Sequence, residues 1–258
     1  MLLEWSILFF AGFFGGILNS LAGGGSFITF PALMLVGIPP VHANATNTFA
    51  SCAGYLSGAY AFRKDIADHS SDIVRIILLS FIGGIAGAWL LLKTPESLFM
   101  EAIPWLLLFA TLLFIYGGKL SQYFNRLSSS YRHASLLATL SLSAFLVFVA
   151  LYGGFFNAGL GIISLSYLAL AGYSNINAMN GIKLLISSCV ALVAIALFIW
   201  EGVIEWQSGF LVLLGTLLGG FVAAKVSRNL SQKLVRNFVS LASISITLYF
   251  FYDVYWVF

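Results

Sequence analysis

The residues best suited to chemistry in this sequence are a few amides, hydroxyls and one lysine that interrupt long apolar stretches. Lys183 is the only basic residue well within such a stretch, and no Asp or Glu accompanies it there. Polar groups at membrane depth are costly and need a partner or a purpose. Because there is no buried carboxylate for a cation site or a proton relay, the set favours an anion. Lys183 also has a simpler explanation: it lies about 10 Å from the start of its predicted helix, so its long side chain can reach back to the surface.

Two glycine-rich breaks offer further hydrogen-bond donors. Residues 15–19 read Gly-Gly-Ile-Leu-Asn and precede a run of three glycines, whereas residues 153–157 read Gly-Gly-Phe-Phe-Asn and precede Ala-Gly-Leu-Gly. A broken helix frees backbone N–H groups, and the N-terminus of a half-helix carries a partial positive charge, so such a break suits an anion. Asn19 and Asn157 occupy equivalent points beside the breaks, where each side chain either binds a ligand or caps the half-helix.

A polar row opens the apolar span that follows each break. Asn44 and Thr48 share one helix face in the first span, as Asn180 and Lys183 do in the second. Such a face points into protein or a cavity rather than lipid, and hydroxyls near it either bind a ligand or bond back to their own helix. The residues predicted to bind substrate are Asn19, Gly24, Gly25, Ser26, Asn44, Asn47, Thr48, Asn157, Gly159, Gly161, Asn180 and Lys183.

Composition assigns these residues to an integral membrane protein. Of the 258 residues, 60% are hydrophobic and only 8% are charged, against about 25% charged in soluble domains. The net charge of +3 is too small to indicate a nucleic-acid partner. The two cysteines lie in apolar runs, which argues against a disulfide framework or a thiolate metal site. The N-terminus lacks a basic n-region and is expected to belong to the mature fold.

Apolar blocks define the expected helices. Six reach the roughly 17–20 residues that a membrane helix needs, and they cover 41–62, 73–92, 102–118, 176–200, 208–224 and 237–257. Four more form the pairs 5–36 and 136–172, in which a block of about 17 residues precedes one of 11 that reaches only about 17 Å. Each pair is either one interrupted crossing or a hairpin that re-enters and returns.

The two breaks belong to a repeat. A shift of 138 residues superimposes the two Gly-Gly-x-x-Asn pieces, and a shift of 135 then places Gly24 on Gly159 and Gly37 on Gly172. The sequence therefore predicts a tandem duplication with a first repeat over 1–120, a cytoplasmic linker over 121–134 and a second repeat over 135–258.

Charge distribution selects between the two hairpin models. If each pair returns to its own side, the loops 63–75, 119–135 and 225–236 share one side and hold ten of the twelve basic residues. The positive-inside rule places these loops in the cytoplasm and both termini outside. A hairpin plus three crossings is an odd number, so the predicted fold is all-α, with two inverted repeats that each contain a Gly-broken re-entrant hairpin and three transmembrane helices. Inverted repeats with broken helices are typical of secondary transporters.

Catalytic signatures do not accompany these features. The three histidines lie far apart, and neither an HExxH motif nor a G-x-S-x-G elbow is present. The run Gly23 to Ser26 lacks the Gly-Lys-Ser/Thr ending of a phosphate loop. We therefore expect no enzyme activity and no cofactor, with energy supplied by a gradient or a partner.

The sequence resembles the sulfite exporter TauE/SafE family of membrane permeases. The similarity rests on the Gly15-Gly16 and Ala22 to Ser26 break, Pro31, the Gly37 to Pro40 turn and Ala43 to Thr46, with a weaker echo over 153–183. The second half departs from the family pattern, because Ala158-Gly159-Leu160-Gly161 replaces a fuller glycine run and Gly181-Ile182 stands where a Thr-Ser pair is expected.

The resemblance implies a secondary transporter in the bacterial inner membrane. Its expected substrates are small sulfur-containing or organic anions such as sulfite, sulfonates or sulfoacetate, moved by alternating access at a midplane site between the two hairpins. The alternative is a channel-like or structural membrane protein whose glycines only pack helices. The partners left open are a coupling ion, either a proton or sodium, and a second copy in a homodimer.

Overall fold

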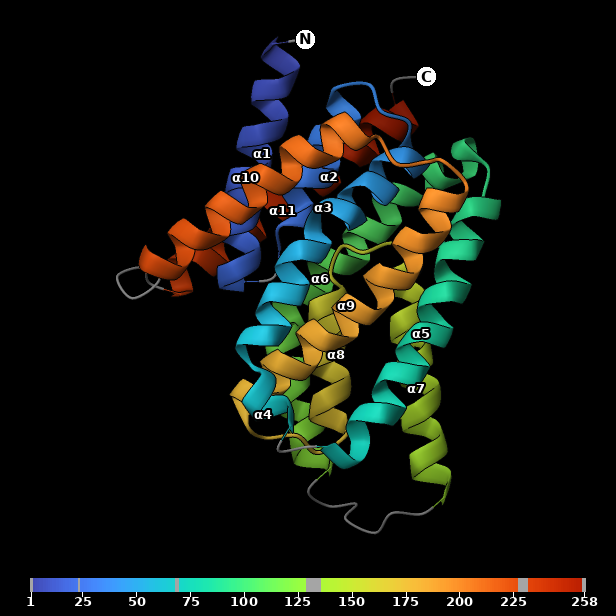
Figure 1. The fold of residues 1–258 in the computed structure, drawn as a ribbon, viewed down its shortest axis with the longest axis vertical. Coiled ribbons are helices and arrows are strands. Elements are labelled where there is room, and N and C mark those ends of the chain that lie inside the picture. Colours follow the sequence, from blue (N-terminus) through green and yellow to red (C-terminus); the bar gives the residue numbers. More distant parts are fainter. Residues whose placement is uncertain (1, 23, 68–69, 129–135, 227–231, 257–258) are drawn as a thin grey trace.

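The chain is described by a computed structural model over residues 2–22, 24–67, 70–128, 136–226 and 232–256. All regular structure in these ranges is helical, which agrees with the all-α prediction. The helices are α1 (Leu2–Ala22), α2 (Ser26–Leu35), α3 (Pro40–Ala61), α4 (Arg63–Ala67), α5 (Ser70–Lys93), α6 (Glu96–Ser128), α7 (Leu136–Phe155), α8 (Leu160–Leu170), α9 (Ile176–Trp200), α10 (Trp206–Val226) and α11 (Gln232–Trp256) (Figure 1).

The helix breaks fall in the gaps between the predicted apolar blocks, and not at the paired glycines. The pairs Gly15-Gly16 and Gly153-Gly154 lie inside α1 and α7, whose helices continue past them. The first interruption comes instead just before Ser26, and the second covers 156–159. The paired glycines continue the helix because neighbouring packing offsets their low helix propensity of about 1 kcal/mol.

The two short helices end in the same way. Gly37 after α2 and Gly172 after α8 both adopt left-handed backbone angles, with φ of +85° and +88°. In each case the glycine and the next residue donate their N–H groups back into the last turn, to Met34 and Leu33 in the first turn and to Ala169 and Leu168 in the second. Glycine suits this position because a Cβ is strained at positive φ.

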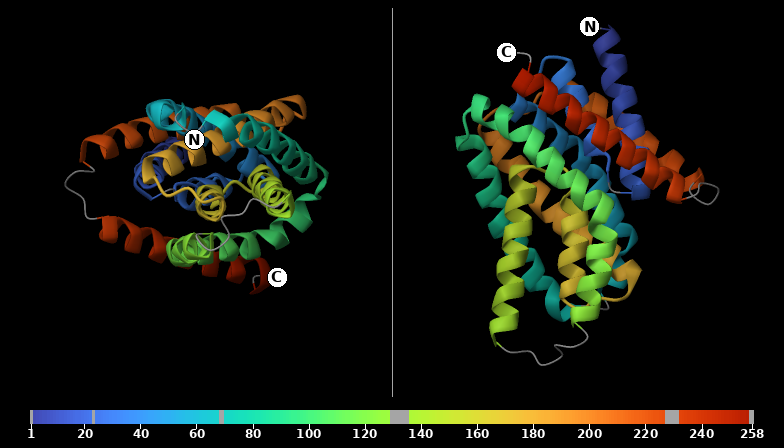
Figure 2. Two further views of the ribbon diagram at one scale, coloured as in Figure 1. Left: turned by 90° about the horizontal axis from the view of Figure 1, so that it is seen from below. Right: turned by 180° about the vertical axis from the view of Figure 1, so that it is seen from behind.

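The longer helix of each predicted hairpin, α1 or α7, packs against a helix from the other half of the chain. α1 lies along α10 and α7 lies along α5, while α3 and α9 pack together between them (Figures 1 and 2). Glycines bring the backbones into contact at both places. A Cβ on Gly16 would meet the backbone of Thr216 on α10, and a Cβ on Gly87 would meet the backbone of Leu151 on α7. The two halves are therefore interlocked rather than side by side.

Four helices among the described residues are long and apolar enough to cross a membrane: 2–19, 72–93, 96–117 and 176–200. Three of these match the predicted spans 73–92, 102–118 and 176–200, whereas the predicted span 41–62 does not qualify by length and composition. The range 41–62 falls short because of its buried amides and hydroxyls. Conversely, the stretch 2–19, predicted as one limb of a hairpin, is long enough alone.

The segment between the halves is partly helical. α6 runs for 33 residues and continues to Ser128, well past the predicted end of its span at 118. Half of the predicted linker 121–134 is thus an extension of a helix, and residues 129–135 lie outside the described part of the chain.

The outer surface is apolar, as a lipid-facing surface must be. Large side chains such as Phe10, Ile82 and Leu241 are more than half exposed. The amides and hydroxyls of α3 face inward, with Asn44 and Asn47 each 1% exposed. In a bilayer this inverted arrangement is the stable one.

Candidate functional site

A cavity of about 40 Å³ lies where the two helix breaks approach each other. Its wall combines residues from both breaks with side chains from α3 and α9. The lining residues are Asn19, Ser26, Tyr55, Asn157, Gly159, Leu160, Gly161, Ile162, Leu165, Lys183, Leu184 and Ser187.

The structure separates the predicted substrate-binding residues into two groups. Six line the cavity: Asn19, Ser26, Asn157, Gly159, Gly161 and Lys183. The other six, Gly24, Gly25, Asn44, Asn47, Thr48 and Asn180, are not among its lining residues. Three residues of this second group, Asn47, Thr48 and Asn180, hydrogen-bond to residues of the first group.

The second break presents backbone donors to the cavity. Gly159 precedes α8 with a left-handed φ of +82°. Leu160 and Ile162 donate their N–H groups to the carbonyls of Asn157 and Gly159, whereas the N–H of Gly161 makes no hydrogen bond within the described residues. This free donor lies in the first turn of α8, where the helix dipole favours negative charge.

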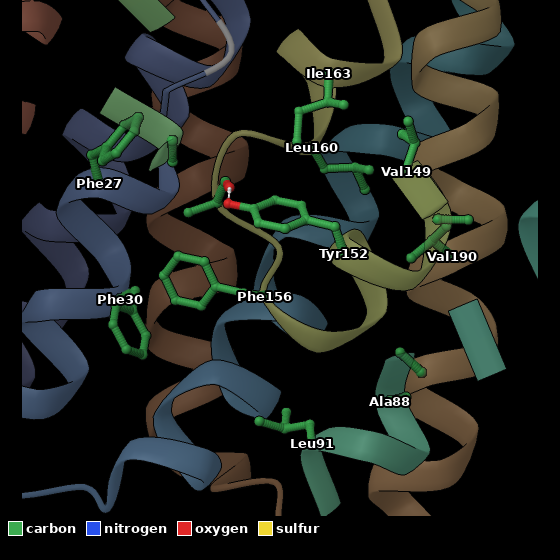
Figure 3. Packing of buried hydrophobic residues seen from close by; sticks show 14 of the residues in the cluster. Phe27, Phe30, Ala88, Leu91, Val149, Tyr152, Phe156, Leu160, Ile163 and Val190 are labelled. Carbon is green, nitrogen blue, oxygen red and sulfur yellow. Dashed lines mark hydrogen bonds between the residues drawn. The ribbon is translucent and has the colours of Figure 1, made fainter. Parts of the chain in front are cut away.

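Tyr152 also holds the second break in place. Its hydroxyl donates to the carbonyl of Ala158 at 2.8 Å, and the ring lies between Phe156 and Leu160 in the apolar core (Figure 3). Tyr152 is 7% exposed and Phe156 is fully buried. The break is therefore a fixed turn on a packed base.

Lys183 is partly exposed, and its stem lies along this break while its ammonium turns back toward the start of α9. Its aliphatic stem passes Gly161, where an added Cβ would lie 3.4 Å from Cδ of Lys183. Its ammonium donates to Oδ1 of Asn180 at 3.2 Å. A neutral amide is the only hydrogen-bond partner of this ammonium among the described residues. Charge compensation therefore has to come from a ligand or from water.

α3 anchors the second break through three side chains. Asn44 donates to the carbonyl of Phe155 at 3.0 Å. Asn157 donates to Oγ1 of Thr48 at 3.4 Å and accepts a hydrogen bond from the hydroxyl of Tyr55 at 3.0 Å. Tyr55 was missed in the sequence, although it lies seven residues after Thr48 on the same helix face and continues that polar row.

α3 also holds the first break. Thr29 donates to Oδ1 of Asn47 at 2.5 Å, and the amide of Asn47 donates to Oγ of Ser26 at 3.3 Å. Gly25 is the N-cap of α2, and its carbonyl oxygen lies 3.2 Å from the same Thr29 hydroxyl oxygen. A Cβ on Gly25 would collide with the backbone of Gly15, so this glycine permits the close approach of α1 and α2.

The equivalence of Asn19 and Asn157 does not hold in the structure. Asn19 lies within the last turns of α1, whereas Asn157 lies in the break itself. Neither side chain caps a half-helix, because the N-cap residues are Gly25 and Gly159. The cause is the position of the breaks: the second follows two residues after Gly153-Gly154, whereas α1 continues beyond Gly15-Gly16 to Ala22.

The groups that surround the cavity favour a negatively charged ligand. The described membrane helices place no carboxylate in its wall, and the described residues include no group of three His, Cys, Asp or Glu that could hold a metal ion. One ammonium, two amides, several hydroxyls and a free N–H surround it. Such a set can bind an anion, but it offers no nucleophile with an adjacent base.

A multi-pass helical chain that encloses a polar cavity between broken helices has the architecture of a membrane transporter. The chain belongs to the sulfite exporter TauE/SafE family, whose model matches residues 8–250. The resemblance noted in the sequence is thereby confirmed.

Relatives with curated names point to the same class. The chain is 33% identical over 252 residues to a "Probable membrane transporter protein" of Haemophilus influenzae, covering 97% of this chain and 96% of the relative. It is 29% identical to "Probable membrane transporter protein YfcA" of Escherichia coli K12, covering 96% and 89%. A further relative, "Probable membrane transporter protein ORF9" of Sinorhizobium sp., is 28% identical, covering 94% and 90%. No solved structure matches the chain significantly.

Proposed function

We propose that the protein is a secondary transporter of a small oxyanion, with sulfite as the first candidate, and that the anion binds in the cavity between the two breaks. The observation that carries this proposal is the combination of Lys183, the free N–H of Gly161 and a cavity wall that contains no carboxylate among the described residues. An anion would supply the negatively charged partner that the Lys183 ammonium lacks among the described residues. The family description supports sulfite as the first anion to test.

Cavity size favours the smaller members of the predicted substrate class. One water molecule needs roughly 10–15 Å³ of cavity volume, so this cavity of about 40 Å³ holds about three water molecules. Sulfite, with one sulfur and three oxygens, is of comparable size. Sulfoacetate carries a second anionic group and would require the cavity to widen. We therefore expect sulfite to bind more tightly than sulfoacetate to the conformation described.

Alternating access is the mechanism that we propose for this site. The exchange of α1 and α7 between the halves and the matching turns at Gly37 and Gly172 support two repeats of the same fold. Inverted repeats allow two conformations of similar energy around one central site. The glycine-mediated pairs α1–α10 and α5–α7 are the natural rigid bodies of such a motion, because their backbones are in contact.

The orientation that we propose places both termini outside the cytoplasm of a bacterial inner membrane. N and C lie at one end of the molecule and α4 lies at the other (Figure 1). All six tryptophans are at least 39% exposed. They lie on the parts of their helices that are near the end of the molecule that holds the termini, and they are Trp5, Trp89, Trp105, Trp200, Trp206 and Trp256. Exposed tryptophans mark a bilayer boundary, and the basic residues Arg63 and Lys64 of α4, at the opposite end, favour the cytoplasm there.

Transport in liposomes tests the function. Purified protein should catalyse saturable uptake of labelled sulfite, and internal unlabelled sulfite should accelerate it by counterflow. Sulfoacetate and a dicarboxylate serve as competing anions. Flux that does not saturate and shows no counterflow would support the channel-like alternative and refute the transporter.

Reporter fusions test the orientation separately. A reporter that is active only in the cytoplasm should be inactive after residue 256 and active in the loop between α10 and α11. The reverse pattern would refute the proposed topology.

A further inference from the structure

The direction of one hydrogen-bond chain can be deduced from its fixed end. The hydroxyl of Thr48 donates its single hydrogen to the backbone carbonyl of Asn44 at 2.9 Å. A carbonyl can only accept, so the oxygen of Thr48 can only accept from its other neighbour. That neighbour is Asn157, 3.4 Å away, which must therefore present its amide nitrogen to Thr48.

The other side of the same amide is then determined. With its nitrogen toward Thr48, Asn157 turns Oδ1 toward the hydroxyl of Tyr55, which donates to it at 3.0 Å. Thr48 and Asn157 are each 2% exposed and Tyr55 is 8% exposed, so bulk water does not compete for these bonds. Asn157 lines the cavity, and the amide hydrogen that Thr48 does not use makes no other hydrogen bond among the described residues.

An asparagine amide has nearly the same shape in its two orientations, so its hydrogen-bond partners alone decide which end faces a ligand. With the amide as found, the hydrogen that Asn157 leaves unbonded is a donor that an anion can use. With the amide reversed, the side chain would instead turn an unbonded carbonyl oxygen toward Thr48, and its lone pairs would repel an anion. The side chains that decide this belong to α3, in the other half of the chain.

We propose that Thr48 and Tyr55 are positioning residues that set the cavity's preference for anions by fixing the orientation of the Asn157 amide. This rests on the proposed function, and it adds the residues that determine which sign of charge the second break accepts. Neither residue has to touch the anion for this role, and Thr48 does not line the cavity.

The experiment compares two tyrosines that each donate one hydrogen bond to the same break. Tyr55→Phe removes the bond to Oδ1 of Asn157, and the control Tyr152→Phe removes the bond to the carbonyl of Ala158. Sulfite uptake into liposomes is measured at matched protein amounts, with thermal unfolding in detergent recorded in parallel. We expect Tyr55→Phe to raise KM about tenfold with little change in kcat, since one hydrogen bond to a charged ligand is at stake. Tyr152→Phe should lower thermal stability and leave KM within about twofold of the parent.

Thr48 gives an independent arm with its own rescue. Thr48→Val keeps the shape and removes the acceptor, so KM should rise, whereas Thr48→Ser keeps the hydroxyl and should restore KM. A double-mutant cycle adds the decisive readout: in an Asn157→Ala background, Tyr55→Phe should have almost no further effect on KM.

The outcomes separate this inference from the proposed function. A parent protein that transports no sulfite refutes the proposed substrate before any variant is compared. If the parent transports sulfite, equal KM values in Tyr55→Phe and Tyr152→Phe would overturn the positioning role. Full additivity of Tyr55→Phe with Asn157→Ala would overturn it as well. If Tyr55→Phe does not fold, the comparison of Thr48→Val with Thr48→Ser decides.

Discussion

α3 and α9 follow corresponding breaks and pack together, yet they use their polar residues in opposite ways. A shift of 135 residues places Thr48 of α3 on Lys183 of α9. Thr48 is fully engaged with protein groups on both sides. Lys183 has one neutral partner and lines the cavity. The comparison indicates that one helix builds the site and the other supplies its charge.

The N-terminal ends of α3 and α9 also differ in how they are held in place. The N-terminal part of α3 is tied to neighbouring loops: Glu96 accepts from the backbone N–H of Val41 at 3.0 Å, and Thr46 accepts from the backbone N–H of Glu205 at 3.0 Å. His42 lies 3.3 Å from the carboxylate of Glu205. These contacts fix α3 against both halves of the chain.

The N-terminus of α9 is capped locally. The side chain of Asn175 accepts from the N–H groups of Asn177 and Ala178. Nearby, Tyr173 donates to Asp72 at 3.4 Å. Burial and then the Asp72 carboxylate raise the pKa of Tyr173 to about 12, so it remains a donor at neutral pH. The start of α9 is therefore held by its own capping residue, whereas the start of α3 is held by contacts with other segments.

The largest expected effect is at Lys183. Lys183→Gln should weaken sulfite binding by about 10- to 150-fold, because a charged hydrogen bond is worth about 1.5–3 kcal/mol, while thermal stability stays close to that of the parent. Lys183→Arg should retain part of the affinity. Binding is measured with labelled sulfite at matched protein amounts, with Lys93→Gln, an exposed residue at the end of α5, as the control. Parental affinity in Lys183→Gln would remove the difference between α3 and α9.

The next effect is on stability and belongs to α3. Asn44→Ala should lower the free energy of unfolding by about 1–3 kcal/mol, because it leaves the partly buried carbonyl of Phe155 without its partner. Asn177→Ala, at an exposed position in the first turn of α9, should change it by less than about 0.5 kcal/mol. Denaturant unfolding in detergent provides the measurement. Equal losses in both variants would contradict the idea that α3 is the structural helix.

The smallest effect separates two adjacent serines on α9. Ser187 lines the cavity, whereas Ser188 donates to the carbonyl of Leu184 at 2.8 Å in its own helix. Ser187→Ala should raise KM for sulfite two- to tenfold, roughly the value of one neutral hydrogen bond. Ser188→Ala should leave KM unchanged. A larger effect in Ser188→Ala would mean that the ligand lies on a different face of α9.

Much of the architecture could be predicted from local sequence. The apolar blocks and the scarcity of charge identify a membrane protein, since hydropathy depends on composition alone. The turns at Gly37 and Gly172 could be paired from spacing, because a left-handed residue after a helix favours glycine wherever it occurs. Six of the twelve candidate residues line one cavity. They could be selected from the sequence because polar groups within apolar runs are costly and therefore uncommon.

Tertiary structure alone decided the roles of these residues. The side-chain bonds that fix the second break join residues 102, 109 and 111 positions apart, and no local pattern encodes such partners. The same cause explains why Asn44, Asn47 and Thr48 support the site without lining it and why Tyr55 joins it. It also explains why Asn19 and Asn157 lost their apparent equivalence. A sequence repeat fixes which residues are available at each break, whereas the packing of α3 and α9 fixes which polar atoms are already bonded and which remain free for a ligand.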